Sequence, residues 1–219
     1  MVEIKRYSPV AFKASPKRTE VRDNWTVVLE YDGEGQAAFG QSNVNENYLV
    51  DLSHITRLDV QSSNLDAITP FGITIPQGLC ESYLQDGVLI NRMNRIQASV
   101  FCLSGKRPEM PTESSYTETT EVGMCMAIIG KDVFSITEKL TSLDFMDYAK
   151  TTPFLYQAPM SHIPCQIITL SRDGAKSGII FTASRGYGKD MVHAIMDAGA
   201  EFGLKPAGED KVKSWLNTL

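Results

Sequence analysis

The sequence that decides the fold is AIMDAGAEFGLKPAG, residues 194–208. Apolar side chains recur there and just before it at spacings of three and four residues, namely Met191, Ile195, Ala198 and Phe202. This spacing places them on one face of an α-helix. Gly203 can adopt the left-handed conformation that ends a helix, and Pro206 cannot continue one. The stretch therefore predicts an amphipathic helix that ends near Phe202 and a chain that then turns sharply.

Length and charge limit the classes of function. With 219 residues the chain can form one large domain or two small lobes. Its formal net charge is -5, and its Lys and Arg residues are scattered, so it lacks the basic patch that nucleic acid requires. No apolar run approaches the ~20 residues that span a bilayer, and no signal peptide is recognisable. We expect a cytoplasmic protein that binds neither nucleic acid nor membranes.

The cysteines and histidines show no metal-ligand spacing. Cys80, Cys102, Cys125 and Cys165 lie far apart and mostly within apolar runs, which favours buried free thiols. The three histidines are equally dispersed, so we expect no metal site. Cys165 and His162 are close enough in sequence for a nucleophilic thiol with a base, although nothing in the spacing establishes contact between them.

The first half of the chain reads as an arm, a lobe and a linker. Residues 1–22 are rich in Lys, Arg, Pro and Ser and predict an extended N-terminal arm that wraps a partner. Residues 23–104 form the first α+β lobe, with strands expected at 25–31, 48–52 and 55–60 and a hairpin at 87–90 and 98–103. Residues 105–121 contain almost no aliphatic side chain and predict an exposed linker.

The second lobe, residues 122–219, has a more regular pattern. Strands are expected at 124–129, 165–170 and 179–183, and helices from 133 to about 143 and from 189 to 202. This order is strand, helix, strand, strand, helix, which is the core of a ferredoxin-like α+β fold. A short helix over residues 209–219 follows, with Val212, Trp215 and Leu216 available for packing.

Four segments in order resemble one protein family. Residues 198–208 fit the pattern AGxxxGLKPxG, 51–53 read DLS, 130–132 fit the turn GxD, and 184–188 resemble the element SRxGYxGE. The chain resembles the folate-dependent aminomethyltransferases of the glycine-cleavage T-protein family and the gamma subunit of sarcosine oxidase. The resemblance implies two ferredoxin-like lobes, as in the N-terminal folate-binding region of T-proteins, without their C-terminal barrel.

The resemblance also names candidate site residues. Arg185, Tyr187 and Asp190 would bind folate, with Asp190 in place of the glutamate of the SRxGYxGE element. Asn91 stands near the position of a first-lobe aspartate that T-proteins use to activate the folate nitrogen, and an amide cannot titrate. Asp51 is a further weak catalytic candidate, because it could form an acid–base pair with His54. A capped turn with an exposed histidine is the simpler interpretation of these two residues. Arg185 as a surface residue and Tyr187 as a packing residue are the corresponding structural interpretations.

The implied function is that of a sarcosine oxidase gamma-like accessory subunit. It would belong to a complex that passes a methyl-derived carbon from a methylated amine to tetrahydrofolate, with larger flavoprotein or methyltransferase subunits as partners. The sequence has no Gly-x-Gly-x-x-Gly fingerprint, so we expect no flavin or nicotinamide on this chain. One alternative is a stand-alone aminomethyltransferase in which Asp51, Asp86 or Asp190 replaces the missing carboxylate. Another is a folate-binding regulatory or assembly module.

Overall fold

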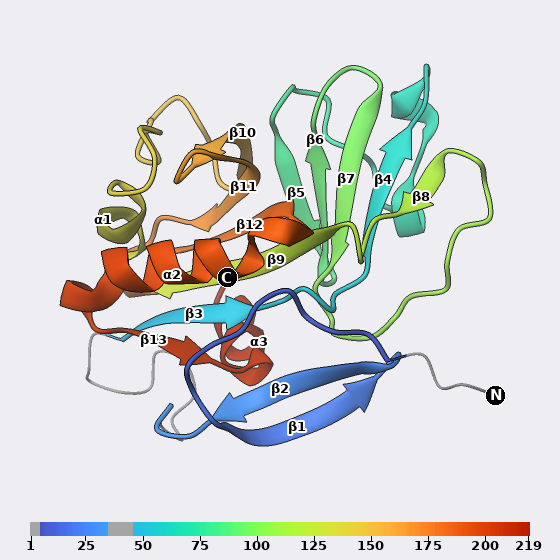
Figure 1. Cartoon of the computed structure of the whole chain (residues 1–219). Coiled ribbons are helices and arrows are strands. Elements are labelled where there is room, and N and C mark those ends of the chain that lie inside the picture. The colour runs from blue at the N-terminus through green and yellow to red at the C-terminus, as the bar shows by residue number, and fades with distance from the viewer. Residues whose placement is uncertain (1–4, 35–45) are drawn as a thin grey trace.

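A six-stranded sheet forms the centre of the protein. The computed structural model describes residues 5–34 and 46–219 and shows three β-sheets and a few helices (Figure 1). The six strands lie in the order β10-β11-β12-β9-β3-β13. They are β3 (Asn47–Asp51), β9 (Gly123–Gly130), β10 (Phe154–Met160), β11 (Ile163–Ser171), β12 (Gly178–Ser184) and β13 (Leu204–Ala207). Neighbours run antiparallel except β3 and β13, which are parallel. The α+β class predicted from the sequence is confirmed.

A five-stranded antiparallel sheet faces it. Its order is β5-β6-β7-β4-β8, and its strands are β4 (Arg57–Gln61), β5 (Ser82–Gln85), β6 (Val88–Arg92), β7 (Gln97–Cys102) and β8 (Tyr116–Glu118). The predicted hairpin is confirmed, because β6 and β7 pair directly. Two 3₁₀ turns, η1 (Leu65–Ala67) and η2 (Pro70–Gly72), lie on the side of this sheet where Leu58 and Val60 are buried.

The helices are short except for the one that the opening stretch predicts. They are α1 (Val133–Thr137), α2 (Gly188–Gly199) and α3 (Glu209–Leu216), with 3₁₀ turns η3 (Gly174–Lys176), η4 (Arg185–Tyr187) and η5 (Ala200–Phe202). After η5, Gly203 has φ 65°, so the predicted left-handed C-cap is confirmed. Pro206 then lies in β13. α1 is shorter than predicted, although Leu140 and Leu143 still pack on the same core from the turn that follows.

The six-stranded sheet is covered on both faces. Helices α1 and α2 pack on one face, where Ile136 and Ile195 meet Met126. On the other face Ile180 packs with Phe101 of the five-stranded sheet and Trp215 of α3. The layers are therefore two helices, the six-stranded sheet, and then the five-stranded sheet with α3. Figure 1 shows α2 lying across its face of the larger sheet.

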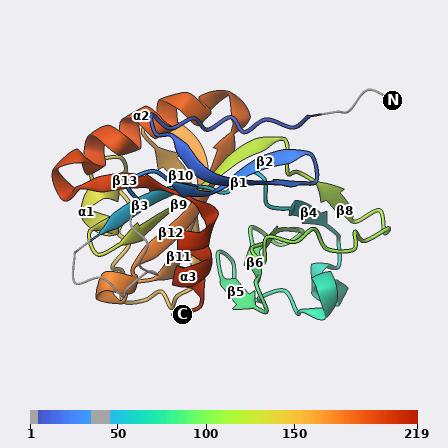
Figure 2. The same ribbon diagram turned by 90° about the horizontal axis from the view of Figure 1, so that it is seen from below.

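The described part of the N-terminal segment packs on this chain, which corrects the prediction of an extended arm. β1 (Pro16–Arg22) pairs with β2 (Trp25–Tyr31) through a turn at Asp23 and Asn24, both with positive φ. Asn and Asp tolerate this conformation, so the pair was a hairpin signal that the sequence analysis missed. Val10 and Phe12 pack on the core beneath α2. Figure 2 shows the segment before β1 passing beside α2.

Two segments pair in ways that the expected lobe and linker limits do not imply. β3, expected in the first lobe, pairs with β9 of the second, and its residues Tyr48–Val50 are buried. A strand that is buried on both faces requires a covered central position, which the larger sheet provides. In the expected linker, Tyr116–Glu118 forms β8 and pairs with β4. A strand from the expected first lobe therefore belongs to the sheet of the second, and part of the expected linker is a strand of the smaller sheet.

Candidate functional site

Two cavities open at opposite ends of the core between the facing sheets. One has a volume of about 810 Å³ and lies at the end of β11 that contains Ser171. The other has a volume of about 640 Å³ and lies at the end that contains Cys165 and Gln166. The apolar residues Leu89, Phe101 and Ile180 fill the space between the sheets. The first cavity combines an apolar floor with charged groups, so we treat it as the candidate functional site.

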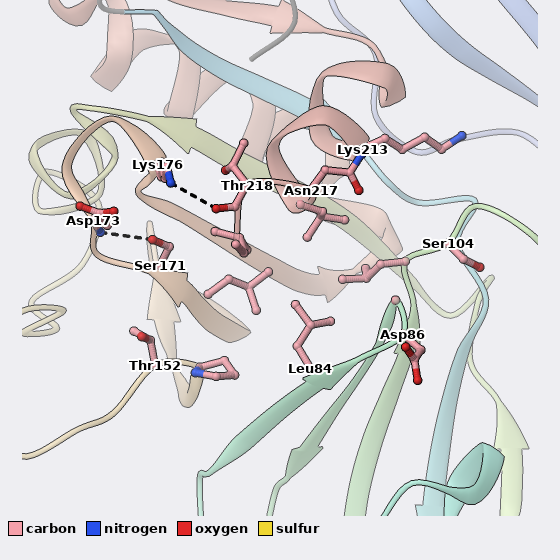
Figure 3. A pocket seen from close by; sticks show the side chains of 16 residues that line it. Leu84, Asp86, Ser104, Thr152, Ser171, Asp173, Lys176, Lys213, Asn217 and Thr218 are labelled. Atoms are coloured by element: carbon pink, nitrogen blue, oxygen red, sulfur yellow. Dashed lines mark hydrogen bonds between the residues drawn. The ribbon is translucent and has the colours of Figure 1, made fainter. Parts of the chain in front are cut away.

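Three elements form the walls of the first cavity (Figure 3). Strand β5 and the turn after it contribute Leu84 and Asp86, the end of α3 contributes Lys213 and Leu216, and the β11–β12 connection contributes further polar groups. Its apolar lining residues are Leu84, Leu103, Pro153, Leu170, Leu216 and Leu219, and its charged side chains are Asp86, Asp173, Lys176 and Lys213. Apolar walls with a few polar groups are typical of small-molecule sites.

Local sequence explains how two of these walls are placed. Asp86 and Gly87 both have positive φ and connect Gln85 to its cross-strand partner Val88. An Asp-Gly pair favours this two-residue hairpin turn, which brings Asp86 to the rim of the cavity.

Trp215 holds α3 against the β11–β12 connection. Its indole Nε1 donates a 2.8 Å hydrogen bond to the carbonyl oxygen of Lys176. Its ring also packs against Gly178, where an added Cβ would lie only 2.2 Å from a ring carbon. These contacts bring Lys176 close enough to α3 for its Nζ to donate to the carbonyl oxygen of Thr218 at 3.3 Å.

A buried carboxylate anchors the other lysine. Lys213 Nζ lies 2.8 Å from Glu209 Oε2, and the Glu209 side chain is only 3% exposed. Glu209 Oε1 also lies 3.0 Å from His54 Nε2, and both Glu209 oxygens accept from Arg22. Burial by itself raises the pKa of Glu209, but hydrogen bonds from His54, Arg22 and Lys213 outweigh it and hold the pKa well below its usual range. This carboxylate is therefore charged at neutral pH and fixes the position of Lys213.

Asn91 lies inside the protein and does not line the first cavity. It is fully buried in β6, where its Oδ1 accepts a 2.7 Å hydrogen bond from Ser82 Oγ and its Nδ2 donates to Ser99 Oγ at 3.2 Å. Every group in this chain of contacts is neutral. The arrangement joins adjacent strands and contains no group that titrates near neutral pH.

The three predicted folate-binding residues lie together beside the N-terminal segment. Arg185 donates to the carbonyl oxygen of Tyr7 and stacks over the Trp25 ring at 6.0 Å. Tyr187 is 45% exposed, and Asp190 is an exposed residue in the first turn of α2. None of them lines the first cavity. In this structure Arg185 holds the N-terminal segment in place.

Asp51 and His54 do not form the acid–base pair considered in the sequence analysis, because each has another partner. Asp51 Oδ1 accepts a 2.9 Å hydrogen bond from the backbone N–H of Ser53, which is the capped turn expected from the sequence. The histidine was expected to be exposed, but its side chain is only 9% exposed because it contacts Glu209. No residue near His54 in sequence reveals that contact.

A second Ser-Arg pair in the sequence does reach the cavity. Residues 171–174 read SRDG and so repeat the first letters of the element SRxGYxGE. Ser171 and Asp173 line the cavity, and Asp173 N–H donates to Ser171 Oγ at 3.2 Å (Figure 3). Arg172 instead donates to the carbonyl oxygens of Asp147 and Lys150. This repeated signal could have directed the sequence analysis to the cavity.

The remaining features of the described ranges are the possible metal ligands, the apolar helices and the cysteines. Among residues 5–34 and 46–219, no three His, Cys, Asp or Glu side chains are grouped to hold a metal ion. No helix in these ranges is long and apolar enough to cross a membrane. All four cysteines are free, and three are buried as predicted, whereas Cys80 is half-buried. Burial raises the pKa of Cys165 to about 11, which disfavours the nucleophilic thiolate.

Comparisons with known proteins show the fold. No family model and no curated protein matches the sequence. A chain of the heterotetrameric sarcosine oxidase from Corynebacterium sp. U-96, solved with pyrrole 2-carboxylate, matches with a TM-score of 0.61 and 13% identity, over 74% of this chain and 88% of that one. The glycine cleavage system aminomethyltransferase T from Bartonella henselae matches with a TM-score of 0.57 and 11% identity, over 90% of this chain. This chain spans 57% of the length of that transferase. The chain thus has the fold of these two proteins.

Proposed function

We propose that this chain is an accessory subunit, similar to the gamma subunit of sarcosine oxidase, of a cytoplasmic one-carbon complex. The complex would pass a methyl-derived carbon from a methylated amine to tetrahydrofolate. The observation that carries the proposal is the first cavity, about 810 Å³ with an apolar floor and the cationic side chain of Lys176, between the sheets of this fold. The fold match to a chain of a heterotetramer supports a role as a subunit.

The cavity suits the chemistry of a reduced folate. Its volume lies within the range of about 300–1,000 Å³ that is usual for small-molecule sites. Leu84, Leu170 and Leu216 offer apolar contact to the flat ring systems of the ligand. Lys176, which forms no salt bridge among the described residues, offers positive charge to a carboxylate of its glutamate tail. We therefore place tetrahydrofolate here and not beside Arg185, whose guanidinium already binds the N-terminal segment.

An accessory role fits the chemistry of Asn91 better than autonomous catalysis does. Its amide lies in a neutral, buried network and cannot serve as a general base. One observation favours the alternative of a stand-alone aminomethyltransferase. Asp86, which could replace the carboxylate missing at Asn91, lines the cavity. Transfer of a methylene group to tetrahydrofolate by the isolated chain, abolished by Asp86→Asn, would establish that alternative.

Binding of the folate can be tested by calorimetry. Wild-type protein is titrated with tetrahydrofolate under reducing, oxygen-free conditions, and the same titration is made with Ser104→Trp, which places a large ring at the exposed rim of the cavity. The matched control is Ser114→Trp, an exposed position that lines none of the cavities described here. We expect Ser104→Trp to weaken binding by at least about tenfold and Ser114→Trp to leave it unchanged.

The role as a subunit needs a separate measurement. Tagged protein is expressed with its neighbouring genes and purified at moderate salt, and co-purifying chains are identified by mass. We expect larger subunits, among them a flavoprotein, in fixed ratio to this chain. A monomer without associated chains would contradict the subunit proposal, and a wild-type protein that does not bind tetrahydrofolate would contradict the site.

A further inference from the structure

The second cavity, a groove at the opposite end of the sheet interface, has its own polar lining. Asp59 of β4 and Ser99 of β7 are cross-strand partners on one wall of the groove. On the other wall, Gln166 of β11 is the cross-strand partner of both Gln157 of β10 and Thr182 of β12. Ser99 Oγ donates a 3.0 Å hydrogen bond to Gln166 Oε1 and connects the walls. Polar groups in register therefore face the groove from both sheets.

The groove contains a buried cation that has no anionic partner. Arg57 is 2% exposed, and its guanidinium donates to the carbonyl oxygens of Ser53, Thr120, Gly123 and Met124 and to Thr182 Oγ1. Among the described residues, no carboxylate lies within 4 Å of it, and its Nε has no hydrogen-bond partner. Asp51 acts on it only from beyond salt-bridge distance. A buried charge without a close counter-charge is costly, even when neutral acceptors surround it.

The same strand presents a carboxylate that has no cationic partner. The oxygens of Asp59 accept from the amides of Gln61, at 2.5 Å, and Gln97, at 2.7 Å. In the described ranges no Lys, Arg or His nitrogen lies within 4 Å of this carboxylate. Asp59 lies two residues after Arg57, on the same face of β4, so their Cα atoms are about 7 Å apart. Both residues line the groove without pairing with each other.

Neutral groups between these charges are also available to a ligand. Gln157 donates its Nε2 hydrogen to the Met93 carbonyl oxygen, and Gln166 uses its Oε1 to accept from Ser99. In the part of the chain that the structure describes, Gln157 Oε1 and Gln166 Nε2 have no hydrogen-bond partner. The wall thus offers one acceptor and one donor side by side.

We propose that this groove binds a free amino acid in its zwitterionic form. The ligand carboxylate lies toward Arg57 and accepts from Gln166 Nε2, while its ammonium group lies toward Asp59. An aliphatic side chain contacts Met93, Phe101 and Val122, which also line the groove. The site is separate from the first cavity and does not depend on folate binding there.

The two charges give the site its selectivity. A ligand that carries only a carboxylate leaves Asp59 without a counter-charge, and one that carries only an ammonium group leaves Arg57 without one. Binding that leaves a polar group of the site without a partner is weaker, so both single-charge ligands are disfavoured.

The first test compares leucine with two derivatives that each lack one of its charges, on the wild-type protein. Leucine, N-acetylleucine and leucinamide are titrated at pH 7, and binding is followed by calorimetry and by ligand-observed NMR. We expect leucine to bind with a millimolar or lower Kd and the two blocked probes to bind at least about tenfold more weakly. The proposal is overturned if leucine at about 10 mM shows no binding. It is also overturned if either blocked probe binds as tightly as leucine.

The second test removes one charge from the protein. Asp59→Asn keeps an oxygen for the Gln97 amide and is expected to weaken leucine binding by about tenfold or more. The matched control Asp197→Asn changes an exposed carboxylate on α2 and should leave binding unchanged. Equal affinities of the two variants would overturn the proposal. If Asp59→Asn does not fold, Gln166→Leu replaces it with the same expected loss, because it removes the Nε2 donor proposed for the ligand carboxylate.

Discussion

Replacing Glu209 by Gln should destabilise the fold more than any other single charge change near α3. Glu209 is the first residue of α3, and its side chain is 3% exposed. It contacts Arg22 of β1, His54 after β3 and Lys213 one helical turn later. Glu209→Gln keeps the size of the side chain but removes the negative charge that these three groups share. Two cations and a histidine are then left with a neutral amide.

The magnitude follows from the burial of each partner. Removing one member of a fully buried ion pair costs about 3–5 kcal/mol. The Arg22 and Lys213 side chains are 20% and 38% exposed, so water solvates part of the remaining charge. We therefore expect a loss of about 2–3 kcal/mol in the free energy of unfolding. For a chain of this size the Tm should fall by about 4–12 °C.

Urea denaturation at several pH values measures this effect. The folded pKa of Glu209 is lowered, so its contribution is fully present above the unfolded value of about 4.3 and is lost as the pH falls toward the folded pKa. The difference between wild type and Glu209→Gln should thus hold from pH 7 to about 5 and shrink below about pH 4. The matched control is Asp210→Asn, which changes the next residue, an exposed one that pairs with Arg18. Equal losses for both variants, or a difference that persists in acid, would refute the reasoning.

Two further predictions concern the sheet interior and the packing of α3. Asn91→Asp places a carboxylate in a fully buried neutral network. Burial should raise its pKa above the unfolded value, so the variant should lose about 2–4 kcal/mol at pH 7 and recover stability as the pH falls, as measured by urea denaturation. Unchanged stability at pH 7 would contradict this. Gly178→Ala forces a Cβ against the Trp215 ring and should cost about 1–3 kcal/mol in thermal denaturation. Gly186→Ala meets no atom within 4 Å and should cost far less, and equal losses would show that Trp215 moves freely.

Local sequence was sufficient for elements whose signals lie within a few residues. The apolar spacing before residue 203 predicted α2, and Gly203 and Pro206 predicted where the chain leaves the helix. The hairpin of β6 and β7 followed from two β-branched runs. The Asp86-Gly87 turn was equally local, and Asp86 was the one considered carboxylate that lines the first cavity.

Sheet membership could not be predicted in the same way. β3 pairs with β9 about 75 residues later, and no local pattern specifies a partner at that separation, because strand pairing depends on which faces the rest of the chain covers. The element SRxGYxGE illustrates the consequence for the site. Residues 184–188 resemble the element but hold the N-terminal segment, whereas residues 171–174 fit only its start but reach the cavity.

The sequence by itself determined the helix that ends at Gly203, the apolar strands and the resemblance to a folate-dependent family, because turn chemistry and side-chain periodicity act over a few residues. The tertiary structure alone decided where charges meet. Glu209 contacts Arg22 and His54, which lie 187 and 155 residues earlier in the sequence. Arg57 donates a hydrogen bond to Thr182, which lies 125 residues later. Electrostatic and hydrogen-bond contacts depend on distance in space, which sequence separation does not reveal, so both cavities were visible only in the folded chain.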